Sequence, residues 1–332
     1  MISGLGLMLA LRTHVARSVP EMDRIAPLWN ELLKQQKHTI FQSFAWNRLA
    51  AEVFADRMTP YVVWVKSDSG AAILPAAIHH RLNRIELLGE TLFDYRDVLH
   101  GGDREVLRLA WQQLATCGKS LRVVSIENAA ATPRWSGFPL LPFARAPRVD
   151  RSQLDESAFR MAHSRLGRQM RRLKRLQVDL RVYSGADSAV VRHLYECKRS
   201  NFATDADNLF LDQRRCDFMG AAAAAAGNGC EIFALESQGG ELVAGLVSFR
   251  DGSIRRCYTI YFHPAWAHYS PGIALLYEVT ARSLAEGLSC DYMTGEYPYK
   301  LRLANSSRQL FRVETNAQEL AGIAGGRIES AA

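Results

Sequence analysis

The sequence predicts an α/β protein of two domains, each with a mixed, mostly antiparallel central sheet flanked by helices. The chain has 332 residues, more than a single average core contains. In the second half of the chain, the spacing of apolar residues predicts elements in the order strand, two helices, three strands, helix, strand and strand. The first half shows the same order without obvious residue identity. We therefore expect one domain at residues 1–150 and a second at 151–332.

Each element of the second half has its own sequence signal. Alternating apolar residues predict the strands, Gly239–Gly240 predicts a hairpin turn, and Asp212 caps a helix that runs into six alanines. Gly287 ends the helix that opens at Pro271. The predicted elements are strand 178–183, helices 187–202 and 212–226, strands 231–236, 242–249 and 254–262, the helix from 271, and strands 290–293 and 310–313.

The first half is predicted in the same way. Its elements are strand 12–16, helices 21–36 and 43–54, strands 61–65, 71–79 and 84–88, a helix at 103–117 and a strand at 121–126. Residues 139–151 are rich in proline and arginine, so we expect them to link the two domains.

Composition and charge indicate which kinds of protein and of binding partner fit this chain. With 48% hydrophobic and 23% charged residues, the chain is typical of a soluble globular protein, and no segment is long and apolar enough to span a bilayer. Six scattered cysteines form no CxxC pair and have no histidine at ligand spacing, which indicates reduced thiols, a cytoplasmic location and no metal site. A net charge of +7 favours acidic partners: cofactor phosphates, an acidic carrier protein or nucleic acid.

Residues 165–175 form a strongly basic helix. Six of its eleven residues are cationic: Arg165, Arg168, Arg171, Arg172, Lys174 and Arg175. Four of these follow steps of three and four residues and make one stripe, opposite an apolar stripe of Leu166, Met170 and Leu173. The stripe is either a solvated face, a docking site for an acidic carrier protein, or a site for the ribose phosphate of coenzyme A. Nucleic acid is disfavoured because no aromatic residue interleaves the stripe.

The turn at residues 269–272 is a candidate phosphate site. It follows a strand and opens a helix, so unpaired backbone N–H groups and the positive end of the helix dipole meet there. It also belongs to an ordered series of short motifs: Leu242-Val243-Ala244-Gly245, Tyr269-Ser270-Pro271-Gly272, Glu286-Gly287, Asp291-Tyr292, Gly295 and Tyr299-Lys300. The first half contributes Phe41-Gln42-Ser43 with Trp46, and Asp94-Tyr95-Arg96-Asp97.

These motifs and the element order resemble the CelD-type acetyltransferase family of the GNAT superfamily, a branch related to the tandem-GNAT Fem transferases. The resemblance spans nearly the whole chain. The Gln/Arg-x-x-Gly-x-Gly phosphate loop of typical GNAT enzymes is replaced here by Ser-Pro-Gly-Ile. The long paired-helix arm of Fem ligases that use aminoacyl-tRNA is absent from the sequence pattern.

The resemblance implies roles for residues of the second half. A backbone N–H among Thr259, Ile260 and Tyr261 would hold the thioester carbonyl, and the backbone of Ser270, Pro271, Gly272 and Ile273 would hold a pyrophosphate or pantetheine phosphate. Arg168 and Arg172 would add charge for the cofactor. Candidate acids are Tyr269 and Tyr297, with Tyr299 behind them; candidate bases or amine anchors are Glu296 and Asp291, and His268 is a weaker one. Lys300 would bind a phosphate or the acceptor's carboxylate.

In the first half, Asp94, Tyr95, Arg96 and Asp97 either bind the acceptor or form a self-paired turn. We expect a cytoplasmic N-acyltransferase, with no metal, that moves an acyl group from acyl-CoA or an acyl-carrier protein to a primary amine of a small molecule, sugar or peptide. Its centre would lie in the second domain and face the groove between the domains, the first domain being a degenerate copy. The alternatives are an aminoacyl-tRNA-dependent transferase and a non-catalytic module that binds nucleic acid or a carrier protein.

Overall fold

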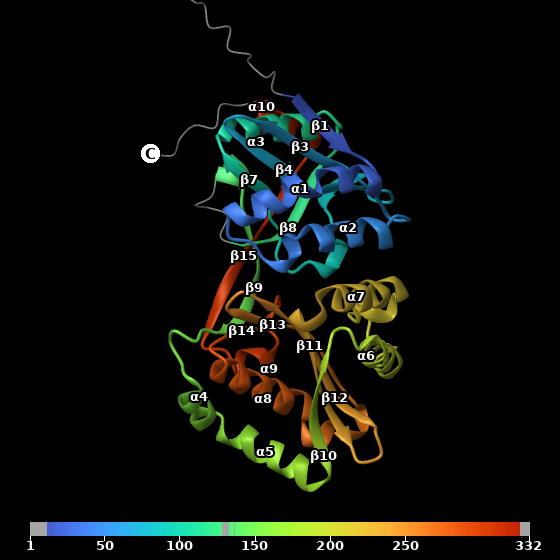
Figure 1. The fold of residues 1–332 in the computed structure, drawn as a ribbon, viewed down its shortest axis with the longest axis vertical. Helices are drawn as coiled ribbons and strands as arrows, with labels where there is room; N and C mark the ends of the chain where they lie inside the picture. Colours follow the sequence, from blue (N-terminus) through green and yellow to red (C-terminus); the bar gives the residue numbers. More distant parts are fainter. Residues whose placement is uncertain (1–11, 128–132, 136, 326–332) are drawn as a thin grey trace, which may run out of the picture. The chain divides into compact units, whose positions relative to one another are not determined.

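The computed structural model describes residues 12–127, 133–135 and 137–325 (Figure 1). It is a mixed α/β structure of mostly antiparallel sheets flanked by helices, so the predicted fold class is confirmed. No helix in the described ranges is long and apolar enough to cross a membrane.

Two compact units make up the chain. Unit 2 is Ala144–Gln309, and unit 1 contains the described residues before and after it. Strands β9 (Leu141–Val149) and β15 (Ser306–Thr315) cross the boundaries between the units. The expected second domain, 151–332, therefore differs from unit 2 at its end, because β15 pairs with β8 (Leu121–Glu127) of unit 1. The expected linker at 139–151 is largely the strand β9.

Unit 1 contains two sheets. One is antiparallel, in the order β1 (Arg12–Ala16), β3 (Val62–Ser67), β4 (Gly70–Leu74) and β7 (Leu99–Gly102). The other has the order β15, β8, β6 (Arg84–Leu87), β5 (Ala76–His79) and β2 (Met58–Pro60), and β6 runs parallel to β8. The sequence predicted one strand over 71–79. Pro75 divides it, because proline has no N–H for the ladder, and β4 and β5 enter different sheets.

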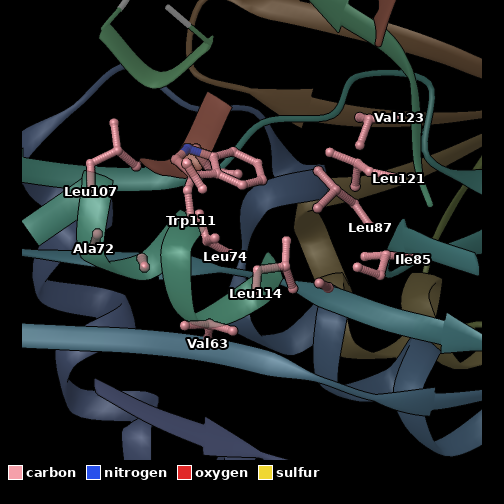
Figure 2. Close-up of a cluster of buried hydrophobic side chains, with 14 of the residues drawn as sticks. Val63, Ala72, Leu74, Ile85, Leu87, Leu107, Trp111, Leu114, Leu121 and Val123 are labelled. Atoms are coloured by element: carbon pink, nitrogen blue, oxygen red, sulfur yellow. The ribbon is translucent and has the colours of Figure 1, made fainter. Parts of the chain in front are cut away.

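The helices of unit 1 pack against these sheets. They are α1 (Val19–Gln35), α2 (Phe44–Val53), α3 (Arg104–Ala115) and α10 (Ala317–Gly325), with short 3₁₀ turns at Ile40–Gln42, Glu90–Leu92 and Pro133–Trp135. Figure 2 shows Trp111 and Leu114 of α3 among apolar side chains of the strands. That cluster includes Val63, Ala72, Leu74, Ile85, Leu87, Leu121 and Val123, all buried. Unit 1 therefore has its own hydrophobic core.

Unit 2 is built on one sheet with the order β10 (Val178–Ser184), β11 (Cys230–Ser237), β12 (Leu242–Asp251), β13 (Ile254–Phe262), β14 (Ser289–Asp291) and β9. All of these pairs are antiparallel except β13 with β14. Helices α6 (Ser188–Asn201) and α7 (Gln213–Ala226) lie on one face, and α4 (Glu156–Ala162), α5 (Ser164–Arg175) and α8 (Pro271–Ala285) lie on the other (Figure 1). A short helix, α9 (Pro298–Leu301), and 3₁₀ turns at Leu209–Leu211, Gly227–Gly229 and Pro264–Tyr269 complete it.

A buried ion pair joins β13 to β14. Arg256 and Asp291 are the last cross-strand partners of the two strands, and Arg256 Nη1 donates to Asp291 Oδ2 at 2.8 Å. Both side chains are only 3% exposed. Arg256 Nε also pairs with Asp251 at 2.6 Å, and Asp291 Oδ1 accepts the Met293 N–H at 2.8 Å. These additional bonds satisfy the charges, as a buried pair requires.

We expect Asp291→Ala to lower the free energy of unfolding by about 3–5 kcal/mol, because it removes a partner from a buried guanidinium. Urea unfolding followed by circular dichroism measures this change. The matched control is Asp23→Ala, which breaks an exposed pair with Arg48 and should cost about 1 kcal/mol or less. Equal stability of the two variants would contradict a stabilising role for Asp291.

Candidate active site

Strands β13 and β14 run together for three residues and then separate. Their parallel pairing joins Ile254–Arg256 to Ser289–Asp291. After β14 the chain turns at Met293, whose φ is +63°, and the Tyr292 N–H donates to the Pro147 carbonyl beside β9. β13 continues to Phe262 with β12 as its strand neighbour. In the described structure, residues 257–262 of β13 therefore keep one edge without a strand partner, which we call the open edge.

Along a strand, the backbone N–H and C=O groups of successive residues point to opposite edges, and this decides which residues of β13 face the open edge. The His263 N–H donates to the Val243 carbonyl, and the register continues through Tyr261 opposite Gly245. Hydrogen-bonded pairs alternate in an antiparallel ladder, so Tyr261 and Thr259 bond to β12, and Ile260 points its N–H and C=O toward the open edge. Of the three predicted carbonyl-binding residues, Ile260 is the one with this orientation. A bulge at residue 258 precedes it.

Lys198 of α6 reaches the same edge. Its Nζ donates to the Ile260 carbonyl oxygen at 2.8 Å. Burial lowers the pKa of this amine to about 8, and the Asp205 carboxylate opposes that effect. Lys198 is not among the residues predicted for the site, although the sequence carries a signal for it: Lys198 lies four residues after Leu194 and seven after Val191, on the buried face of the helix.

The surroundings of Lys198 are aromatic and amide groups. Asn201 Nδ2 donates to the Tyr261 hydroxyl at 2.6 Å, and the Phe202 ring lies 5.5 Å from the Phe262 ring. Burial raises the pKa of Tyr261 to about 12 and also raises the pKa of the Cys197 thiol. The Tyr261 phenol and the Cys197 thiol are therefore neutral at physiological pH, and neither places a charge beside Lys198.

The first turn of α8 packs on side chains of residues 260–262, in the part of β13 that has the open edge. A Cβ added to Gly272 would meet the Phe262 side chain at 3.4 Å and the Ile260 side chain at 3.8 Å. Ser270, at the N-cap, has left-handed φ and ψ of 49° and 51°, and its side chain does not cap the helix. Pro271 has no N–H, so Gly272 and Ile273 supply the first-turn N–H groups that lack an intrahelical acceptor.

Basic helix α5 is close to this turn. The Arg172 guanidinium lies 4.7 Å from the centre of the Tyr269 ring, and the exposed His268 ring lies 3.8 Å from the same ring. None of the six cationic side chains of α5 forms a salt bridge with another described residue. The helix face predicted from the arginine spacing is therefore exposed and not neutralised by the described parts of the protein.

The segment after β14 contributes Tyr299, which packs against the same core as Ile260. Burial raises the pKa of Tyr299 to about 12, and the Tyr297 and Cys257 groups add to the effect. The Tyr297 ring is 55% exposed and stacks on Tyr299 at 6.0 Å. Glu296 is exposed, 3.7 Å from the Arg145 guanidinium. Tyr299 thus stays protonated at neutral pH, and Glu296 remains at the surface.

Two residues of the predicted site are held inside the fold. Asp291 is occupied by Arg256 and by the Met293 N–H, so we assign it a structural role in place of the expected base. Lys300 is also buried, and its Nζ donates to the Thr294 carbonyl at 2.7 Å and to the Met293 carbonyl at 3.4 Å. Lys300 therefore holds the loop that follows β14. This role differs from the predicted one, in which Lys300 binds a phosphate or a carboxylate.

The charged cluster of unit 1 bonds to neighbouring elements. Tyr95 is buried, and Arg96 Nη1 donates to the Leu87 carbonyl at 2.7 Å. Asp97 accepts from Trp135 Nε1 at 2.9 Å and pairs with Arg134. Asp94 is partly exposed. These contacts join the cluster to other elements of unit 1.

The comparisons with known proteins agree on the fold. Residues 160–301 match the family model described as "Acetyltransferase (GNAT) domain". A search of curated proteins found no match. Three similar solved structures cover nearly the whole chain: L-PGS from Bacillus licheniformis (TM-score 0.56, 12% identity, 91% of this chain and 97% of that one), FemX (0.53, 9%, 94% and 100%) and a tandem GNAT protein from the clavulanic acid biosynthesis pathway (0.52, 11%, 92% and 98%).

The class of the fold follows from these likenesses. The chain has a GNAT-type acyltransferase fold of the kind found in a tandem GNAT protein, and unit 2 contains all of the matched residues 160–301. At identities near 10% the solved structures establish the fold alone. Among the described residues, no three His, Cys, Asp or Glu side chains are grouped to hold a metal ion.

We expect Lys300→Met to lower the free energy of unfolding by about 2 kcal/mol, because the carbonyls of Thr294 and Met293 lose a buried charged donor. Differential scanning calorimetry provides the measurement. Lys37→Met, at an exposed site, is the control and should change stability by about 0.5 kcal/mol or less. If both variants melt at the wild-type temperature, Lys300 does not hold the loop.

Proposed function

We propose that this protein is a cytoplasmic N-acyltransferase that moves an acyl group from a thioester donor to a primary amine, as the CelD-type resemblance implies. One observation carries the proposal: the Ile260 N–H faces the open edge, and the side chain of the same isoleucine packs against the first turn of α8. A fixed N–H stabilises the negative charge that develops on a thioester carbonyl during attack. Six described cysteines remain free thiols, which suits a reducing compartment.

The donor would be held at two places. The N–H groups of Gly272 and Ile273, at the positive end of the α8 dipole, would bind a phosphate of acyl-CoA or of a pantetheine carried by a carrier protein. Arg172, next to Tyr269, and Arg168 one turn earlier would bind a further phosphate or an acidic carrier protein. The pantetheine would then run along the open edge toward Ile260.

The chemical step needs a proton for the departing thiolate. Tyr299 is the best-placed donor, because its pKa of about 12 keeps the phenol protonated at neutral pH. Tyr269 lies under Arg172, on the phosphate side of the site. Glu296 and Tyr297 are exposed in the loop after β14, where they would anchor the ammonium of the incoming acceptor.

A second candidate function is transfer from a polyanionic aminoacyl-tRNA donor. The unpaired cations of α5 favour it, since each phosphate contact made by a lysine or arginine releases a counterion. In that case binding of tRNA would weaken steeply with salt, and neutralising the α5 arginines would reduce the slope. The same salt-dependent binding without any transfer would indicate a non-catalytic module.

We expect acyl-CoA thioesters, tested from acetyl to palmitoyl, to raise the melting temperature of the purified protein. A ligand at about 100 times its Kd adds about 2.7 kcal/mol to folded-state stability. Arg172→Ala should reduce the shift, and Arg24→Ala, at an exposed arginine of α1, should leave it unchanged. Absence of a shift with every thioester and with free coenzyme A would exclude a coenzyme A site and point to a carrier-bound donor or a binding module.

We expect Tyr299→Phe to lower kcat about 10²-fold with little change in KM, because the phenol would act in the chemical step and not in donor binding. Since the phenol is protonated far above neutral pH, wild-type activity should show no loss of this donor between pH 6 and 9. Tyr183→Phe, in the strand β10, is the control and should keep the wild-type kcat. Steady-state kinetics with the best thioester measure both variants, and a wild-type kcat in Tyr299→Phe would remove Tyr299 from the mechanism.

A further inference from the structure

A partly buried amine on α6 lies beside the residue whose N–H we propose to hold the thioester carbonyl. Lys198 Nζ is 2.8 Å from the Ile260 carbonyl oxygen, and the backbone N–H of Ile260 also faces the open edge of β13. A lysine is rarely buried unless its head group has a charged partner or a chemical role. Here the partner is a single backbone carbonyl, a neutral acceptor that does not compensate the buried positive charge.

We propose that Lys198 is the catalytic base that takes the proton from the attacking amine. This assignment rests on the proposed N-acyltransferase function and adds the group that makes the acceptor reactive. A primary amine attacks a thioester only when its lone pair is free, and it must lose one proton as the amide forms. A neutral Lys198 amine beside Ile260 can accept that proton in the site.

Atoms and electrons balance in this step. The lone pair of the acceptor nitrogen forms the C–N bond, and the C–S bond breaks with its electron pair on sulfur. The proton lost by nitrogen goes to Lys198 Nζ, and the thiolate receives the proton of the Tyr299 phenol. Lys198 then releases its proton while Tyr299 regains one. The net change is acyl transfer with one proton moved from nitrogen to sulfur.

The neighbours of Lys198 favour its neutral form. Asn201 and Tyr261 are uncharged, the Cys197 thiol stays protonated, and Lys198 itself is largely removed from water. Asp205, in the loop after α6, is the carboxylate that acts in the opposite direction. Glu196 and Arg199 of α6 are also charged, at exposed and partly exposed positions respectively. Burial lowers the pKa of Lys198 more than the Asp205 carboxylate raises it, so this pKa is about 8, below that of an ordinary lysine.

The first test measures the titration of Lys198 without any substrate. The chain has seven lysines, so ¹³Cε labelling gives few signals, and Lys198→Met assigns the relevant one. We expect its NMR titration midpoint near pH 8, well below the other lysines. Between the lowered folded value and the ordinary unfolded one the unfolded chain binds more protons, so stability should rise with pH there and Lys198→Met should abolish the rise. A midpoint near 10 overturns the proposal.

The second test is the pH profile of kcat/KM. For the wild type it should rise with pH to a plateau, with a midpoint matching the NMR value. Lys198→Arg keeps a cation and a hydrogen-bond donor for the Ile260 carbonyl but cannot release its proton, and Lys198→Met removes both. In each variant kcat/KM should fall about 10²–10⁴-fold, and its rise with pH should disappear. Lys37→Met is the control, with the wild-type profile expected.

The outcomes separate the two claims. Full activity in Lys198→Arg would leave Lys198 as a purely structural partner of the Ile260 carbonyl and overturn its role as base. If Lys198 titrates near pH 8 but the wild type neither binds a thioester nor acylates any amine, the proposed function fails, and the base assignment fails with it. A wild type that binds thioesters and transfers acyl groups, with unchanged kinetics in both Lys198 variants, overturns the Lys198 assignment alone.

Discussion

The ion pair between Arg256 and Asp291 fixes the place where β13 and β14 separate, and the candidate site depends on that separation. It lies at the last paired residues of the two strands, with both side chains almost fully buried. The second oxygen of Asp291 accepts the Met293 N–H, at a residue with positive φ where the chain turns toward β9. One carboxylate therefore ends the parallel pairing and stabilises the turn that opens the edge of β13.

Two elements contact Ile260, and a third packs against the same core. The first turn of α8 packs against its side chain, α6 supplies Lys198 to its carbonyl, and Tyr299 of α9 packs against the same core. In the mechanism we propose, the helix-end N–H groups bind phosphate, the strand N–H stabilises the developing oxyanion, and the amine and the phenol exchange protons. The β13 edge aligns these groups because rigid strands and helices, and not loops alone, position most of them.

Local patterns predicted the elements well because periodicity, caps and turns are local properties. The helix from Pro271, its end at Gly287 and the cap at Asp212 are all present in the structure. The site was only partly predictable. The turn before α8 and the strand that contains Ile260 have sequence signals, whereas the partner of Lys198 lies 62 residues away and that of Asp291 lies 35 away. Lys300, predicted as a phosphate or carboxylate ligand, is buried with its amine bonded to the Thr294 and Met293 carbonyls, six and seven residues earlier, and the Tyr299-Lys300 motif carries no signal for that local bonding.

The most direct test of the open edge is hydrogen–deuterium exchange with a non-hydrolysable acyl-thioester analogue of coenzyme A. If the edge receives the donor, exchange should slow in residues 257–262 of β13 and at Gly272 and Ile273 in the first turn of α8, while unit 1 strands such as β3 stay unchanged. Slowing confined to other segments, at an analogue concentration that saturates binding, would contradict the account, because the donor would then occupy a different site.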